Sequence, residues 1–95
     1  MVVGVLHLDL RFHDCRSLKE KRSCIRQLLS RVKSTFEVAV AEVGSQDKWQ
    51  RAEVGIAAVG SDRAGINQRL DHVINFVEGL GSADLVDHKI ELINV

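Results

Sequence analysis

Histidine and aspartate side chains near the N-terminus alternate in a pattern that could bind a metal ion. His7, Asp9 and His13 share odd-numbered positions, and alternate residues of a β-strand point to the same face of its sheet. Imidazole and carboxylate groups are common ligands of divalent transition metals. However, His13 lies at the end of the strand pattern, and His88 belongs by alternation to the opposite face of its own strand. We therefore expect solvated or core-edge histidines, with no metal and no cofactor.

The two cysteines, Cys15 and Cys24, offer thiol chemistry instead. Two cysteines are too few for a disulfide framework, and their spacing is not that of a zinc site, so we expect reduced thiols in a cytoplasmic protein. Cys15 precedes a predicted helix, where the helix dipole and Arg16 are expected to lower its pKa. The local sequence supplies no base beside it, and Cys24 is expected to pack within the helix. Nucleophilic catalysis is therefore disfavoured.

Positive charge is concentrated in one short segment, which indicates an anionic partner. Residues 16 to 33 contain seven Lys or Arg residues and one acidic residue, Glu20, whereas the whole chain has a net charge of zero. Such cations can neutralise RNA phosphates, but they could equally contact an acidic protein surface or form a solvated helix face. The predicted contact residues are Arg16, Lys19, Lys21, Arg22, Arg26, Arg31 and Lys33.

A polar loop around Trp49, the only tryptophan, is a second candidate surface. Trp49 could anchor an interface or only cover the open end of the core. Asp47 and Arg51 are expected to hold the turn together by a charge-assisted hydrogen bond. Glu42 is expected to pair with Arg51 or Lys48 across the hairpin. The predicted interface residues of this loop are Gln46, Asp47, Trp49 and Arg51.

The composition is that of an ordinary globular protein. Of the 95 residues, 45% are hydrophobic and 27% are charged, which is untypical of a disordered or fibrous chain. The length fits one domain, residues 1–95. The apolar run from Met1 to Leu6 is too short for a membrane span or a signal peptide. We therefore expect a cytoplasmic protein with no membrane partner.

Hydrophobic periodicity predicts four strands and two helices. A period of two predicts the first strand, whose apolar positions are Val2, Leu6, Leu8, Leu10 and Phe12. The other strands are predicted at residues 36–43, 50–59 and 85–95.

Capping signals set the bounds of the two predicted helices. Ser17 and Glu20 have the spacing of a capping box, in which each side chain accepts a hydrogen bond from the other residue's backbone N–H. The first helix is therefore predicted over residues 18–34. The second helix starts after Ser61 or Asp62 and stops at Gly79 or Gly81.

The order of these elements predicts an α+β fold, the ferredoxin-like βαββαβ sandwich. Two helices then cover one face of a four-stranded antiparallel sheet, whose first and third strands are central. The residues predicted to face the helices are Leu6, Leu8, Leu10, Val54, Ile56, Ala58, Ile90 and Leu92. The opposite, open face mixes valines with charged residues, so it could pair with a second copy, meet another partner or remain solvated.

Acylphosphatases share this topology and bind phosphate in the loop after the first strand, where this chain has Arg16. Their arginine works with an asparagine on a nearby strand. Here His13, Asp14 and Cys15 stand where a glycine-rich loop is needed, and the predicted second strand has no asparagine. This route to hydrolysis is therefore disfavoured, and we expect no enzymatic activity.

Four segments resemble the YlxP-like family of small bacterial proteins of uncharacterised function. They are Val2–Leu6, Ser17–Arg22, Phe36–Gly44 and Gln46–Ala52, so the resemblance extends over nearly the whole chain. It implies a ferredoxin-like fold and supplies no known catalytic residue. It also implies a link to RNA or ribosomes, because the genes of such proteins usually lie beside those of translation and ribosome-maturation factors.

The sequence thus favours a non-enzymatic binding protein that contacts RNA or the ribosome through its basic first helix. An acidic protein surface is the alternative partner for the same cations. A further alternative is a protein-interaction module that forms a homo-oligomer, most simply a homodimer, through the open sheet face. The acylphosphatase-like hydrolase is the least favoured of these hypotheses.

Overall fold

Six elements follow one another in the computed structural model, which describes residues 1–95. Their order, β-α-β-β-α-β, is the predicted one. The strands are β1 (Val2–Arg11), β2 (Ala39–Gly44), β3 (Arg51–Gly60) and β4 (Asp84–Asn94), and the helices are α1 (Leu18–Thr35) and α2 (Arg63–Leu80).

The largest difference from the predicted bounds is at the start of β2, which begins at Ala39 rather than at Phe36. Phe36 does not join the sheet, because its backbone N–H donates to the Val32 carbonyl oxygen at 2.9 Å and closes the end of α1. Its ring packs edge-on against Phe76 of α2, with the ring centroids 5.4 Å apart. The aromatic side chain that indicated a strand therefore joins the two helices.

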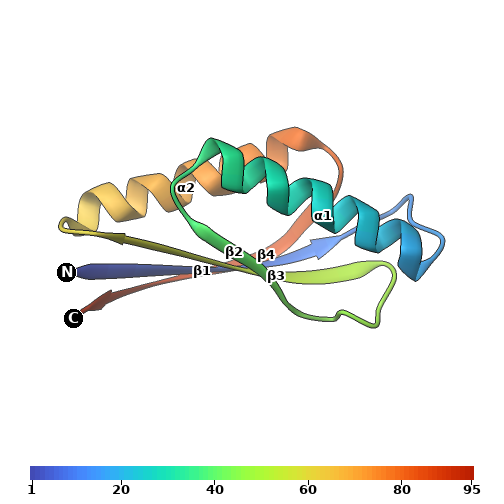
Figure 1. The fold of residues 1–95 in the computed structure, drawn as a ribbon, viewed down its shortest axis with the longest axis horizontal. Coiled ribbons are helices and arrows are strands. Elements are labelled where there is room, and N and C mark those ends of the chain that lie inside the picture. Colours follow the sequence, from blue (N-terminus) through green and yellow to red (C-terminus); the bar gives the residue numbers. More distant parts are fainter.

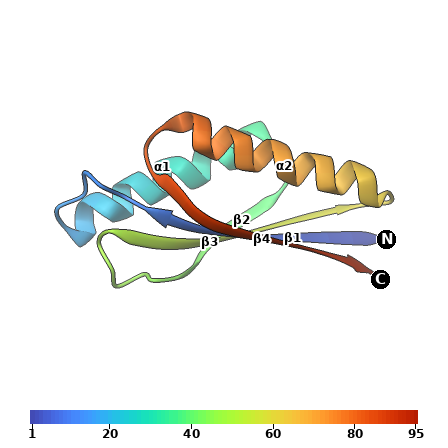
Figure 2. The ribbon, with the colours of Figure 1, turned by 180° about the vertical axis from the view of Figure 1, so that it is seen from behind.

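The four strands form one antiparallel sheet in the order β2-β3-β1-β4, so β1 and β3 are central, as predicted. Leu6 of β1 lies opposite Ile56 of β3 and Ile90 of β4. Both helices lie over the same face of the sheet and leave the other face uncovered (Figure 1 and Figure 2). The fold is the ferredoxin-like α+β sandwich.

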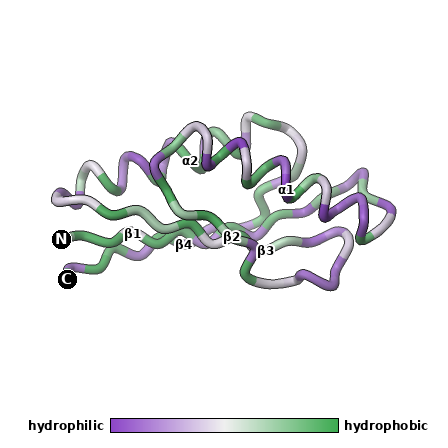
Figure 3. The backbone as a smooth tube through the Cα atoms, in the orientation of Figure 1, coloured by the Kyte–Doolittle hydropathy of each residue, from purple (hydrophilic) through white to green (hydrophobic).

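The core lies between the sheet and the helices. Six of the residues predicted to face the helices are buried, whereas Ile90 and Leu92 are only partly buried because β4 is an edge strand. Hydrophobic and hydrophilic positions alternate along the strands in Figure 3, and the loop between β2 and β3 is mainly hydrophilic. Neither helix combines the length and the hydropathy of a membrane span. The helices bury Ile25, Leu28 and Val32 of α1 and Ile66, Leu70, Val73, Ile74 and Val77 of α2.

Side chains fix the start of α1 much as the sequence predicts. Ser17 Oγ accepts a hydrogen bond from the Glu20 N–H at 3.1 Å. The Glu20 carboxylate accepts from the Arg16 N–H at 2.6 Å and not from the Ser17 N–H. The second half of the predicted capping box is thus displaced by one residue, from the Ser17 N–H to the Arg16 N–H.

The two ends of α2 are set by Asp62 and Gly81. Asp62 accepts a hydrogen bond from the Gly65 N–H at 3.1 Å. Gly81 ends the helix in the left-handed conformation, with φ 70°, which glycine adopts without a Cβ clash. Of the alternatives in the sequence, Asp62 and Gly81 are therefore the residues used.

Gly4 allows α2 to approach β1 closely. A Cβ at this position would collide with Ile66 and would lie 2.9 Å from Leu70 Cδ1. Only glycine fits here without moving α2, which explains why one glycine interrupts the apolar run of the first strand.

Candidate functional site

Six of the seven cations predicted to contact an anionic partner are exposed, and none of the six forms an ion pair within the chain. Four of them share one side of α1, because they are spaced by three, four and seven residues. We call these four the basic ridge: Lys19, Arg22, Arg26 and Lys33. At about 1.5 Å per residue, the ridge is about 21 Å long.

A shallow groove runs beside the basic ridge, between α1 and β2, and is lined by Arg22, Ile25, Arg26, Leu29, Glu42 and Gln46. Arg31, in contrast, lies in a smaller hollow next to Leu80 and Ser82, at the end of α2. Arg16 precedes the helix. The structure therefore brings four of the predicted cations into one row and leaves Arg16 and Arg31 outside it.

Lys21 is the seventh of the predicted cations. The prediction that it lies on the binding surface is wrong. Its side chain has 0% exposure, and its ammonium lies 2.9 Å from the Glu42 carboxylate. The same Nζ donates a hydrogen bond to the Ser45 carbonyl oxygen at 2.7 Å. Lys21 precedes the buried Ile25 and Leu28 by four and seven residues, so the helical period already placed it on the buried face. The partner of Glu42 is therefore Lys21, not Arg51 or Lys48 as predicted.

The open face of the sheet carries an apolar patch at one end. Val3 of β1 lies between Val59 of β3 and Ile93 of β4, and in the next row Val5 lies opposite Ala57. Val59 is 56% exposed and Ile93 is 40% exposed. We call this surface the apolar patch; its residues are Val3, Val5, Ala39, Ala41, Val43, Ala57, Val59 and Ile93.

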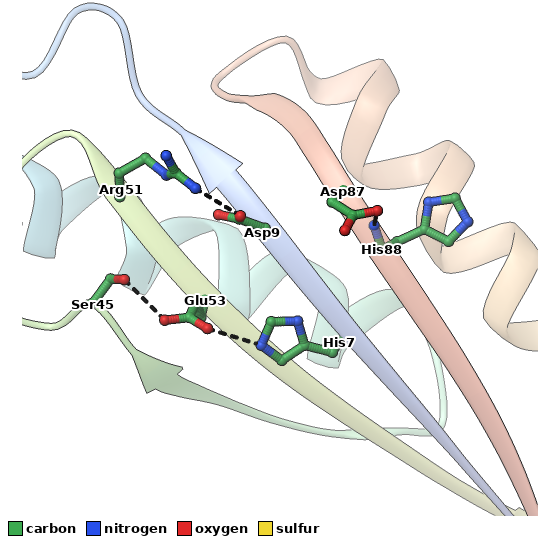
Figure 4. A network of polar contacts seen from close by, with 7 residues as sticks. All are labelled: His7, Asp9, Ser45, Arg51, Glu53, Asp87 and His88. Carbon is green, nitrogen blue, oxygen red and sulfur yellow. Dashed lines mark hydrogen bonds and ion pairs between the residues drawn. The ribbon is translucent and has the colours of Figure 1, made fainter.

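The other end of the open face is a network of polar contacts (Figure 4). His7 Nε2 lies 3.2 Å from Glu53 Oε1, and the Ser45 hydroxyl donates to Glu53 Oε2 at 2.9 Å. Beside them, the Arg51 guanidinium donates to the Asp9 carboxylate at 2.7 Å. Glu53 thus ties the β2–β3 loop to the central strand β1.

The network contains serine, glutamate and histidine, but it lacks the order of a catalytic triad. Glu53 lies between Ser45 and His7, so the imidazole does not contact the hydroxyl and cannot take its proton. The histidines weighed as metal ligands are also separated. His7 contacts Glu53, whereas His13 contacts Asp84 on β4. No three side chains with ligand groups converge on one point.

The β2–β3 loop differs from the prediction in its ion pair. Arg51 contacts Asp9 rather than Asp47, because antiparallel pairing of β1 and β3 places Asp9 diagonally opposite Arg51. The turn is held instead by the Lys48 N–H, which donates to the Ser45 carbonyl oxygen at 3.0 Å. Gln46, Asp47 and Trp49 are exposed, and Gln46 also lines the groove beside the basic ridge.

Cys15 has a raised pKa, so the expectation of a lowered one is wrong. Burial raises its pKa to about 11, and the neighbouring Cys24, Glu20 and Asp14 act in the same direction. Arg16 is exposed, and its charge does not offset these effects. Tertiary burial of Cys15 thus outweighs the local influence of the helix start.

Comparison with known proteins identifies the family. The model of a family described as "Protein of unknown function (DUF503)" matches residues 3–90. The chain belongs to this family. It is also 39% identical over 77 residues to the "Uncharacterized protein YlxP" of Bacillus subtilis (strain 168), which covers 81% of this chain and 84% of that protein. The predicted YlxP-like resemblance is confirmed.

Solved structures similar to this DUF503 chain support the fold alone. The de novo designed protein Foldit4 has a TM-score of 0.52 and 14% identity, covering 99% of this chain and 97% of that chain. SnoaB, a cofactor-independent oxygenase from Streptomyces nogalater, has a TM-score of 0.50 and 11% identity, covering 99% and 92%. A designed protein and an oxygenase share this architecture, so the fold does not indicate one activity.

Proposed function

We propose that this DUF503 protein is a non-enzymatic binding protein that holds RNA phosphates on the basic ridge of α1. One observation carries the proposal: Lys19, Arg22, Arg26 and Lys33 form an exposed row with no carboxylate partner in the chain. Glu42, the acidic residue in the adjacent groove, is paired with the buried Lys21. The ridge therefore keeps its positive charge available to a partner.

The chemistry around the ridge favours RNA over an acidic protein. The other exposed residues from Lys19 to Lys33 are polar or charged and include no large apolar side chain; they are Glu20, Ser23, Gln27, Ser30 and Arg31. Protein interfaces are usually anchored by buried aromatic or other large side chains, and the outer side of α1 offers none. Phosphate contacts need only cations and hydrogen-bond donors. Because α1 carries no aromatic residue, base stacking is absent and binding is expected to be largely independent of RNA sequence.

The proposal is tested by the salt dependence of RNA binding. The anisotropy of a fluorescent single-stranded RNA, titrated with the protein at several salt concentrations, gives Kd at each. Four phosphate contacts predict that log Kd rises with log salt with a slope of about 3. A slope near zero, or no saturable binding at low salt, contradicts the proposal. Tighter binding to polyglutamate than to RNA assigns the ridge to an acidic protein instead.

We propose self-association through the open sheet face as a second function, because exposed aliphatic side chains gather there in the apolar patch. Contiguous exposed apolar surface marks interaction sites. A second copy is the proposed occupant because the polar end of the same face has exposed charges of both signs. A two-fold axis can bring such charges together while the apolar patches meet. These charged residues are Arg11, Asp87 and Lys89, and the exposed Glu91 lies opposite Val5 at the border of the apolar patch.

Light scattering tests self-association directly. The chain of 10.6 kDa is expected to show twice that mass, and Val59→Lys is expected to show the single-chain mass because it places a charge within the apolar patch. Val86→Lys is the matched control, since Val86 is 52% exposed against 56% for Val59 but lies at the irregularity of β4, outside the patch. A single-chain mass for the unmodified protein at high concentration rejects this function.

A further inference from the structure

Cys15 and Cys24 bring two thiols together at the start of α1. Their sulfur atoms lie 3.8 Å apart, and both cysteines are free. Cys15 lies in the irregular segment that joins β1 to α1, and Cys24 lies on α1 itself. The sequence does not predict this contact. Nine residues separate the two cysteines, and only the tertiary fold brings their sulfur atoms together.

We propose that Cys15 and Cys24 are a reversible oxidation site, at which a hydroperoxide converts the two thiols into a disulfide and a dithiol reductant restores them. A disulfide has an S–S length of about 2.05 Å, so the sulfur atoms must approach each other by a little under 2 Å. Cys15 can supply this movement, since its segment belongs to neither a helix nor a strand. This inference is independent of RNA binding.

The surroundings of the two sulfurs give them different roles. A surface hollow lined in part by Asp14, Glu20 and Ser23 includes both cysteines, which gives a small oxidant access to them. Cys15 is buried at 5% exposure, whereas Cys24 is partly exposed. Cys24 is therefore the residue that meets the peroxide, and Cys15 is the residue that closes the bond. The raised pKa of Cys15, about 11, fits this second role, because little of its thiolate is present to attack first.

The reaction balances without any further group. The Cys24 thiolate attacks the peroxide, so that an S–O bond forms, the O–O bond breaks and the released oxygen leaves as water or an alcohol after taking a proton. The Cys15 sulfur then attacks the Cys24 sulfenic acid: an S–S bond forms, the S–O bond breaks, and hydroxide leaves as water with the Cys15 thiol proton. Two electrons pass from the two sulfurs to the peroxide.

Mass spectrometry of the intact protein treated with hydrogen peroxide tests the proposal. The expected product has lost two hydrogen atoms and both titratable thiols, and dithiothreitol restores the original mass. Cys15→Ser is expected to stop at a Cys24 sulfenic acid that dimedone captures. Cys24→Ser is expected to react much more slowly than Cys15→Ser, because its remaining thiol, Cys15, is buried and burial raises its pKa.

Two results would overturn the assignment. The first is direct oxidation of the unmodified chain to sulfinic acid, at the rate seen in Cys15→Ser, which would mean that Cys15 does not capture the sulfenic acid. The second is loss of thiols only through disulfides between chains, seen as a doubled mass on a non-reducing gel. Peptide mapping of the oxidised product identifies the Cys15–Cys24 bond and separates these cases even if a serine variant folds poorly.

Discussion

Replacing Arg22, Arg26 and Lys33 together with glutamine is expected to weaken binding to single-stranded RNA about 50-fold at physiological salt. The reason is counterion release: each lost phosphate contact removes about 0.7 from the slope of log affinity against log salt. The three substitutions should therefore lower that slope by about 2. Anisotropy titrations of the variant and the parent protein across a salt series measure both quantities. The three side chains are exposed and unpaired, so the fold should be unaffected.

A matched control removes the same charge from elsewhere on the surface. Arg31, Lys48 and Arg63 are exposed and lie outside the basic ridge, and their joint replacement with glutamine changes the net charge equally. This control is expected to change the affinity only a few-fold and to leave the slope intact. If the control weakens RNA binding as much as the ridge variant does, the attraction depends on net charge and not on the ridge. If neither variant weakens it, RNA contacts another surface.

The fold could be predicted from the sequence because its signals are local and agree with one another. The alternation of Leu6, Leu8 and Leu10 predicts a strand, and the capping residues Ser17 and Asp62 set the helix starts. Phe36 shows the limit of this reasoning. An apolar residue just after a helix fits the pattern of a following strand, but it can equally pack against another helix. The contact of Phe36 with Phe76 on α2 shows that it packs against a helix.

The candidate site was predictable only where exposure follows from the helical period. The four residues of the basic ridge could be placed on one side of α1 from their spacing alone. The contacts of Arg51 and Cys15 could not, because both depend on residues brought close by the sheet register or by burial. Asp9 is 42 residues from Arg51 in the chain, and a local interpretation selects Asp47 instead. The apolar patch likewise needs four strands in register before its residues become neighbours.

Replacing Lys21 tests whether this cation stabilises the fold or contacts RNA. Lys21→Met is expected to lower the free energy of unfolding by about 3 kcal/mol, because removing one partner of a buried ion pair leaves the other charge without compensation. The Glu42 side chain is only 17% exposed, so water relieves little of that penalty. The Ser45 carbonyl oxygen also loses one of its two donors and keeps only the Lys48 N–H. Urea unfolding followed by circular dichroism measures the change.

The double variant Lys21→Met and Glu42→Leu provides the comparison that isolates the charge. Removing both charges is often nearly neutral, so the double variant should recover all but about 1 kcal/mol, the net contribution of the lost hydrogen bond from Lys21 to the Ser45 carbonyl oxygen. In RNA titrations Lys21→Met should retain the parent salt slope, since a buried ammonium contacts no phosphate. A loss below 1 kcal/mol would mean that the pair is open to water. A reduced slope would mean that Lys21 contacts RNA after all. One substitution therefore tests both the burial of this lysine and the boundary of the basic ridge.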